Sequence, residues 1–127
     1  MPKKLGIKEN QRIALVNAPT DFAPTLGALP AGVEIVKQLR APLDVIVFFT
    51  KSESELLKRF GELAAKLSSA GGLWVAWPKK ASGVATDLSD GVVRQTGLAA
   101  GLVDNKVCAI DETWSGLRFV IRVKDRS

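Results

Sequence analysis

The chain has 127 residues, of which 46% are hydrophobic and 24% charged. This length is typical of one domain, and the hydrophobic fraction is enough for a packed core, so we expect a single domain over residues 1–127. The chain has no histidine, no tyrosine and one cysteine. That excludes a Ser-His-Asp or Cys-His nucleophile and an intrachain disulfide, and we expect no metal site.

The net charge of +5 favours anionic ligands. The basic residues are scattered, with no run longer than Lys3-Lys4 or Lys79-Lys80, and aromatic residues are few. We therefore do not expect nucleic-acid binding. The longest apolar run, Val45–Phe49, is far too short to span a membrane, and no secretory signal follows the basic N-terminus. Together with the single cysteine, these features predict a cytoplasmic protein with no membrane partner.

Strand-like and helix-like segments alternate along the chain. The first predicted strand is Arg12–Asn17, followed by a short helix with Thr20 or Asp21 as its N-cap. The second strand is Val33–Lys37. The third, Asp44–Thr50, is apolar without alternation, as expected of a central strand covered on both faces.

The next helix has the clearest signals in the chain. Ser52 is its predicted N-cap and Glu55 completes a capping box, with Arg59 as a favourable partner for Glu55 one turn later. The helix ends before Gly71-Gly72. Its apolar stripe consists of Leu56, Phe60, Leu63 and Leu67.

The second half of the chain has three more strands. Leu73–Trp77 is the fourth strand, and the polar loop Pro78–Asp87 leads from it to a weaker helix over Leu88–Ala100. The last strands, Val103–Ile110 and Leu117–Val123, are joined by a connection so short that they must form an antiparallel hairpin.

This order predicts a three-layer Rossmann-like α/β fold, with a mostly parallel six-stranded sheet and a C-terminal antiparallel hairpin. Ligands of such sheets bind beyond the carboxyl ends of the strands, at the point where the strand order reverses. If the first strand lies between the second and third, Asn17 and Thr50 flank that point. Trp77-Pro78-Lys79-Lys80 and the hairpin turn Asp111–Gly116 then lie at the same rim.

Two segments of this rim could carry chemistry. Lys79, Lys80 and Ser82, followed by a helix N-terminus, could form a cradle for phosphate or carboxylate. The alternative is a solvated loop in which Thr86 or Asp87 caps the next helix.

The hairpin turn offers two adjacent carboxylates. Asp111 and Glu112 could bind a metal or act as a base, although successive strand residues point to opposite faces and the sequence offers no further ligands for a metal. They could also form ion pairs with Lys79 or Lys80. Trp114 is either a lid over a ligand or a plug that closes the core.

The layout resembles a shortened S-adenosylmethionine-dependent methyltransferase domain over Asp44–Trp77 and the final hairpin. In that fold a glycine-rich turn after the first strand approaches the cofactor, and an acidic residue after the second strand holds its ribose. Here the turn is Asn17-Ala18-Pro19-Thr20-Asp21 without glycine, and Val33–Lys37 is followed by no acidic residue. We therefore assign no cofactor.

A closer resemblance rests on LWVAWPKKASGVATDL (Leu73–Leu88) and GLVDNKVCAIDETWSGLRFVIR (Gly101–Arg122). These strings are similar to an uncharacterised bacterial family, a domain of unknown function with a Rossmann-like, methyltransferase-like shape. The resemblance implies this fold and a bacterial, cytoplasmic setting, but no activity or catalytic residue.

Our leading hypothesis is a binding or interaction module that holds a small anionic metabolite at the rim. The alternative is a vestigial or unusual S-adenosylmethionine-type group transferase, so whether the chain is an enzyme stays open. Arg118 and Arg122 share a strand face, which marks either the solvent side or a homodimer contact. The candidate ligand-binding residues are Asn17, Thr50, Trp77, Lys79, Lys80, Ser82, Asp111, Glu112 and Trp114.

Overall fold

The computed structural model describes residues 5–20, 22, 27–36 and 39–122. The short helix expected after the first strand lies largely outside these residues. Within them, no helix is both long and apolar enough to cross a membrane. The helices are α2 (Glu53–Ala64) and α3 (Asp90–Ala99), with a 3-10 turn η1 (Lys80–Ser82). The strands are β1 (Arg12–Val16), β2 (Glu34–Val36), β3 (Leu43–Phe49), β4 (Leu67–Pro78), β5 (Leu102–Ala109) and β6 (Trp114–Ile121).

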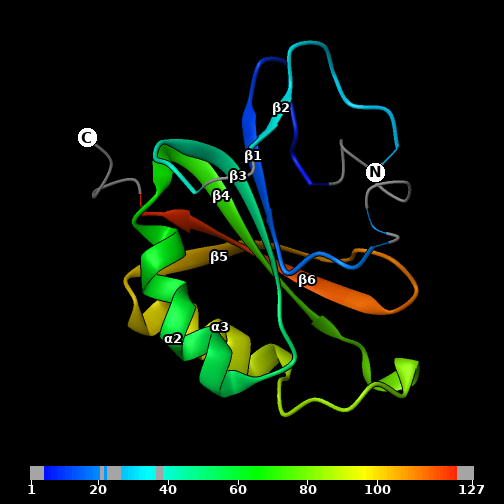
Figure 1. Cartoon of the computed structure of the whole chain (residues 1–127). Coiled ribbons are helices and arrows are strands. Elements are labelled where there is room, and N and C mark those ends of the chain that lie inside the picture. Colours follow the sequence, from blue (N-terminus) through cyan, green and yellow to red (C-terminus); the bar gives the residue numbers. More distant parts are fainter. Residues whose placement is uncertain (1–4, 21, 23–26, 37–38, 123–127) are drawn as a thin grey trace.

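The six strands form one sheet in the order β2-β1-β3-β4-β6-β5 (Figure 1). Neighbouring strands from β2 to β4 are parallel, whereas β6 runs antiparallel to both β4 and β5. The predicted Rossmann-like fold, with a mostly parallel sheet and a C-terminal antiparallel hairpin, is therefore confirmed. The hairpin turn is shorter than predicted, because Trp114, Ser115 and Gly116 already belong to β6. β1 lies between β2 and β3, so the strand order reverses at β1, and its carboxyl end is where a ligand of this fold is expected.

The sheet is covered on both faces by apolar residues. Helices α2 and α3 lie together on one face (Figure 1), where they pack on Ile46 and Phe48 of β3. The alternate residues of β3, including Phe49, face the other side and belong to a second core cluster. There, the indole N–H of Trp74 donates a hydrogen bond of 2.9 Å to the carbonyl of Leu5. The apolar run of β3 is buried on both faces, as its sequence indicated.

The boundary between α2 and β4 differs from the prediction. α2 ends at Ala64, and Leu67 is the first residue of β4, where it pairs with Leu43. A shift of register then follows, and Gly71-Gly72 lies inside the strand, not at the end of the helical unit. Leu67 follows Leu63 at helical spacing and is buried in the same core cluster. The spacing of Leu67 in the sequence therefore fits the apolar stripe of the helix, although Leu67 lies in a strand.

Helix α3 also begins later than predicted. It starts at Asp90 with Ser89 as its N-cap, so neither Thr86 nor Asp87 caps it. Asp87 instead accepts a hydrogen bond of 2.8 Å from the backbone N–H of Glu53, the first residue of α2. The carboxylate thus ties the long polar loop to the preceding helix.

Arg118 is half-buried, with its guanidinium over Gly72 of the adjacent strand β4. A side chain at Gly72 would occupy the space that this guanidinium fills. Arg118 therefore packs on its own sheet, and a homodimer through this face stays a prediction.

Candidate functional site

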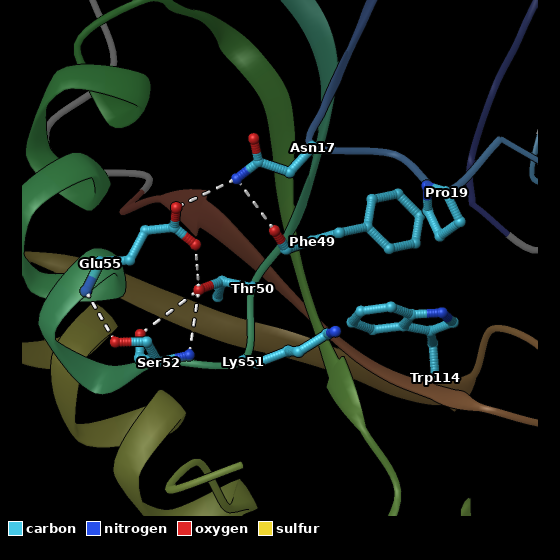
Figure 2. A pocket seen from close by; sticks show the side chains of 8 residues that line it. All are labelled: Asn17, Pro19, Phe49, Thr50, Lys51, Ser52, Glu55 and Trp114. Carbon is cyan, nitrogen blue, oxygen red and sulfur yellow. Dashed lines mark hydrogen bonds between the residues drawn. The ribbon is translucent and has the colours of Figure 1, made fainter. Parts of the chain in front are cut away.

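A cavity of about 640 Å³ opens at the carboxyl ends of β1 and β3, where the strand order reverses. Cavities of this size accommodate small-molecule ligands. Three predicted site residues (Asn17, Thr50 and Trp114) come together here, as expected from the topology. The lining residues are Asn17, Pro19, Phe49, Thr50, Lys51, Ser52, Glu55 and Trp114 (Figure 2).

Asn17 directly follows β1 and has a left-handed backbone conformation, with φ of +58°. Glycine adopts this conformation most easily, and asparagine is among the few other residues that tolerate it. Its side-chain N–H group donates to the carbonyl of Phe49 at 3.2 Å and to the carboxylate of Glu55 at 3.4 Å. Asn17 therefore turns the chain after β1, and links β1 to β3 and α2.

Glu55 is a site residue that the sequence analysis missed. Its backbone N–H donates to the Ser52 hydroxyl at 3.3 Å, which confirms Ser52 as N-cap. Its carboxylate does not return to complete the capping box; it accepts a hydrogen bond of 2.6 Å from the Thr50 hydroxyl. The expected partner Arg59 pairs with Glu62 instead, at 4.0 Å. The carboxylate therefore forms part of the cavity wall (Figure 2).

An aromatic pair forms another wall of the cavity. The rings of Phe49 and Trp114 meet edge to face, with 5.1 Å between centroids and an interplanar angle of 90°. Trp114 is only 8% exposed and belongs to the core cluster on the face without α2 and α3, so it closes the core as well as lining the cavity. The side chain of Lys51 is exposed and extends toward Trp114 (Figure 2). The cavity thus combines a carboxylate, an ammonium group and aromatic rings.

The segments WPKK and DETWSG meet as predicted. Pro78 is opposite Trp114 in the antiparallel register of β4 and β6. The backbone N–H of Lys79 then donates to the carbonyl of Thr113 at 2.8 Å. This contact is made by backbone atoms, so it places the two segments together without using their charged side chains.

The two adjacent carboxylates of the hairpin turn do not act as a pair. Asp111 accepts hydrogen bonds of 2.8 Å from the backbone N–H groups of Thr113 and Trp114, whereas Glu112 is exposed. Among the described residues, no ion pair joins either carboxylate to the lysines of WPKK. The residues that the structure describes also contain no group of three or more acidic or cysteine side chains that could bind a metal. Asp111 therefore has a structural role in shaping the turn.

Two more of the predicted residues lie at a second cavity of about 510 Å³, on the side of α3, whereas Lys79 and Ser82 line neither cavity. Trp77 and Lys80 line it, and the Thr86 hydroxyl ties its loop to the first cavity by donating to the carbonyl of Lys51 at 2.6 Å. The lining residues are Trp77, Pro78, Lys80, Gly83, Val84, Ala85, Thr86, Leu88, Ser89 and Asp90.

The phosphate cradle expected from this loop is not assembled. The Ser82 hydroxyl donates to the carbonyl of Lys79 at 2.6 Å and accepts from the backbone N–H of Val84 at 3.2 Å. The N-terminus of α3 already has a carboxylate in its first turn, Asp90, which is paired with Arg94. The hydroxyl and the helix end are therefore engaged within the protein.

Several solved structures share this fold. A SAM-dependent methyltransferase from Aquifex aeolicus has a TM-score of 0.67 and 18% identity, and the match covers 94% of this chain and 87% of that one. Magnesium protoporphyrin IX methyltransferase from Synechocystis PCC 6803 with bound SAM has a TM-score of 0.60 and 11% identity, over 91% and 71% of the two chains. Fibrillarin from Aeropyrum pernix with natively bound S-adenosyl-L-methionine has a TM-score of 0.59 and 13% identity, over 89% and 67%.

No family model matches the chain, and no curated protein matches it in sequence. Identities this low establish the fold alone. The chain therefore has a methyltransferase-like Rossmann fold, which confirms the shape implied by both resemblances. Its place in the uncharacterised bacterial family stays a prediction.

Proposed function

We propose that this chain binds S-adenosylmethionine in the cavity at the carboxyl ends of β1 and β3, as the cofactor domain of a group-transfer reaction. The observation that carries the proposal is the lining of this cavity. Glu55, Lys51 and an aromatic pair line one cavity and so supply opposite charges beside an apolar wall, at the point where the strand order of a methyltransferase-like sheet reverses.

The ligand matches this lining in three ways. Its amino-acid end carries a carboxylate, which suits the ammonium group of Lys51, and its ammonium and sulfonium groups suit the carboxylate of Glu55. The rings of Phe49 and Trp114 suit its apolar and cationic parts. The turn at Asn17 keeps the left-handed backbone that glycine usually supplies. Bound S-adenosylmethionine supplies an activated methyl group.

The charged amino-acid end should dominate the affinity. Strand β2 ends at Val36, and the sequence after it has no acidic residue to hold the ribose hydroxyls. Fewer polar partners for the adenosine end leave Lys51 and Glu55 as the principal recognition groups.

Isothermal titration calorimetry with S-adenosylmethionine tests the proposal. We expect saturable binding by the native chain, and the absence of detectable binding would contradict the proposal. Lys51→Glu should weaken binding by about tenfold, which corresponds to about 1.4 kcal/mol. Lys8→Glu makes the same charge change before the amino end of β1, at the opposite end of the strand from the cavity. It should leave the affinity unchanged.

The second candidate is a non-enzymatic module that binds a small anionic metabolite at the rim. It is favoured by the exposed Lys51 and Lys80 at the two cavities, and by the net charge of +5. A thermal-shift screen with nucleotides, phosphate and acyl anions discriminates the two. An anion that raises the melting temperature of the native chain, but not of a Lys79→Ala, Lys80→Ala variant, supports this candidate. It is abandoned if no anion stabilises the native chain.

A further inference from the structure

The carboxylate of Glu55 is held in the cavity wall by neutral groups. One oxygen accepts from the Thr50 hydroxyl at 2.6 Å, and the other accepts from the side-chain amide of Asn17 at 3.4 Å. Asn17 is itself fixed by its bond to the carbonyl of Phe49. A carboxylate has about four acceptor positions, so this one keeps capacity for a further donor or a cation.

Among the described residues, no ion pair neutralises this charge, and the exposed Lys51 of the same cavity extends toward Trp114 and not toward Glu55 (Figure 2). Within the described part of the chain, ion pairs join Arg59 to Glu62 and Arg94 to Asp90 and Asp104, and none involves Glu55. Arg59 also lies over the ring of Phe48, 5.8 Å from its centroid. A half-buried carboxylate without an ion-pair partner stabilises a cationic ligand group that lies directly beside it.

The aromatic wall acts in the same direction. Phe49 and Trp114 are 2% and 8% exposed, and both line the cavity. The faces of aromatic rings attract cations, most strongly where water is excluded. Glu55 and the two rings come from α2, β3 and β6, so three separate elements place groups that favour positive charge around one cavity.

We propose that Glu55 determines specificity in this cavity by selecting the positively charged sulfonium of S-adenosylmethionine over the neutral thioether of S-adenosylhomocysteine. This inference rests on the proposed function and deepens it. The two molecules share the adenosine, the ammonium group and the carboxylate, and differ in the methyl group and the charge on sulfur. A site that recognises this charge binds the methyl donor more tightly than the demethylated form.

Calorimetry with three ligands tests the inference on the native chain. S-adenosylmethionine should bind about tenfold more tightly than S-adenosylhomocysteine, given the strength of cation recognition in a partly desolvated site. In sinefungin, a carbon that bears a protonated amine replaces the sulfonium, so the positive charge is kept. Sinefungin should therefore bind with an affinity similar to that of S-adenosylmethionine. Equal or tighter binding of S-adenosylhomocysteine would overturn the inference.

A matched pair of variants assigns the effect to one residue. Glu55→Gln keeps the shape and an acceptor for Thr50 but removes the charge, so it should weaken S-adenosylmethionine about tenfold and S-adenosylhomocysteine less than about twofold. Glu62→Gln removes the same charge from the exposed side of α2 and should change neither affinity. If Glu55→Gln weakens the binding of both ligands by the same factor, Glu55 binds the ammonium group that they share, and the inference is wrong. If neither ligand binds the native chain, the proposed function itself fails.

Discussion

The hydroxyl of Thr50 donates a hydrogen bond of 2.6 Å to the carboxylate of Glu55, and this contact joins the sheet to the first turn of α2. Thr50 follows β3 directly and is only 3% exposed. Its backbone N–H donates to the carbonyl of Ala76 in the neighbouring strand at 3.0 Å. The sheet therefore fixes Thr50, and Thr50 fixes the direction of the carboxylate that we place at the centre of ligand recognition.

Replacing Thr50 with valine should destabilise the fold and misplace Glu55. Valine has nearly the same shape but leaves a carboxylate without its donor, at a cost of about 2 kcal/mol for a hydrogen bond to a charged group. Thr50→Ser keeps the hydroxyl and removes one methyl group, which costs about 0.8 kcal/mol. Urea unfolding measures both variants. No loss in Thr50→Val, together with a loss in Thr50→Ser, would mean that the buried methyl group matters and the hydrogen bond does not.

The adjacent acidic residues of the hairpin turn should respond differently to substitution. Asp111→Ala removes the acceptor of two backbone hydrogen bonds, and we expect a loss of about 1–2 kcal/mol. Glu112→Ala removes an exposed carboxylate and should change the stability by less than about 0.5 kcal/mol. Thermal unfolding of the two variants under the same conditions measures the difference. A comparable loss from Glu112→Ala would show that the turn depends on both carboxylates.

The topology and the location of the rim could be predicted from the sequence because they depend on local patterns. The continuous apolar run of β3 and the short connection between β5 and β6 each allow few arrangements. Once β1 is placed between β2 and β3, Asn17 and Thr50 must lie side by side. These steps need only strand order and the right-handedness of crossovers.

The function of individual side chains could not be predicted in the same way. A glutamate three residues after Ser52 has the same pattern whether it completes a capping box or points into a cavity. The outcome depends on Thr50, whose position is set by its backbone hydrogen bond to Ala76, and on Asn17, which is 38 residues away from Glu55. Asp87 is a similar case, since its partner Glu53 is 34 residues away. Long-range hydrogen bonds of this kind leave no local signal in a single sequence.

The loop between β4 and α3 should loosen when Asp87 is replaced. Asp87→Ala removes the acceptor for the first backbone N–H of α2, and loss of such a contact costs about 1 kcal/mol. Asp87→Asn keeps a side-chain oxygen and should lose less. Hydrogen exchange at the amide of Glu53 reports the contact directly, and we expect faster exchange in Asp87→Ala than in Asp87→Asn. Unchanged protection in both variants would contradict the tether.

Helix α3 packs on β6 through Gly97, which lies so close to the ring of Phe119 that a Cβ atom would overlap it. Phe119 cannot retreat easily, because it is fully buried and its ring meets Phe60 edge to face at 5.3 Å. Gly97→Ala should therefore destabilise the fold by about 1–3 kcal/mol through overpacking, despite the better helix propensity of alanine.

Gly91 provides the matched control within the same helix. A Cβ atom there meets nothing within 4 Å, so Gly91→Ala should stabilise the fold by up to about 1 kcal/mol. The two substitutions are chemically identical, and opposite signs in urea unfolding would show that contact with β6, not helix propensity, requires glycine at position 97. If Gly97→Ala is also stabilising, the helix must be able to move away from the sheet. In that case, the second cavity at the N-terminus of α3 should change shape with it.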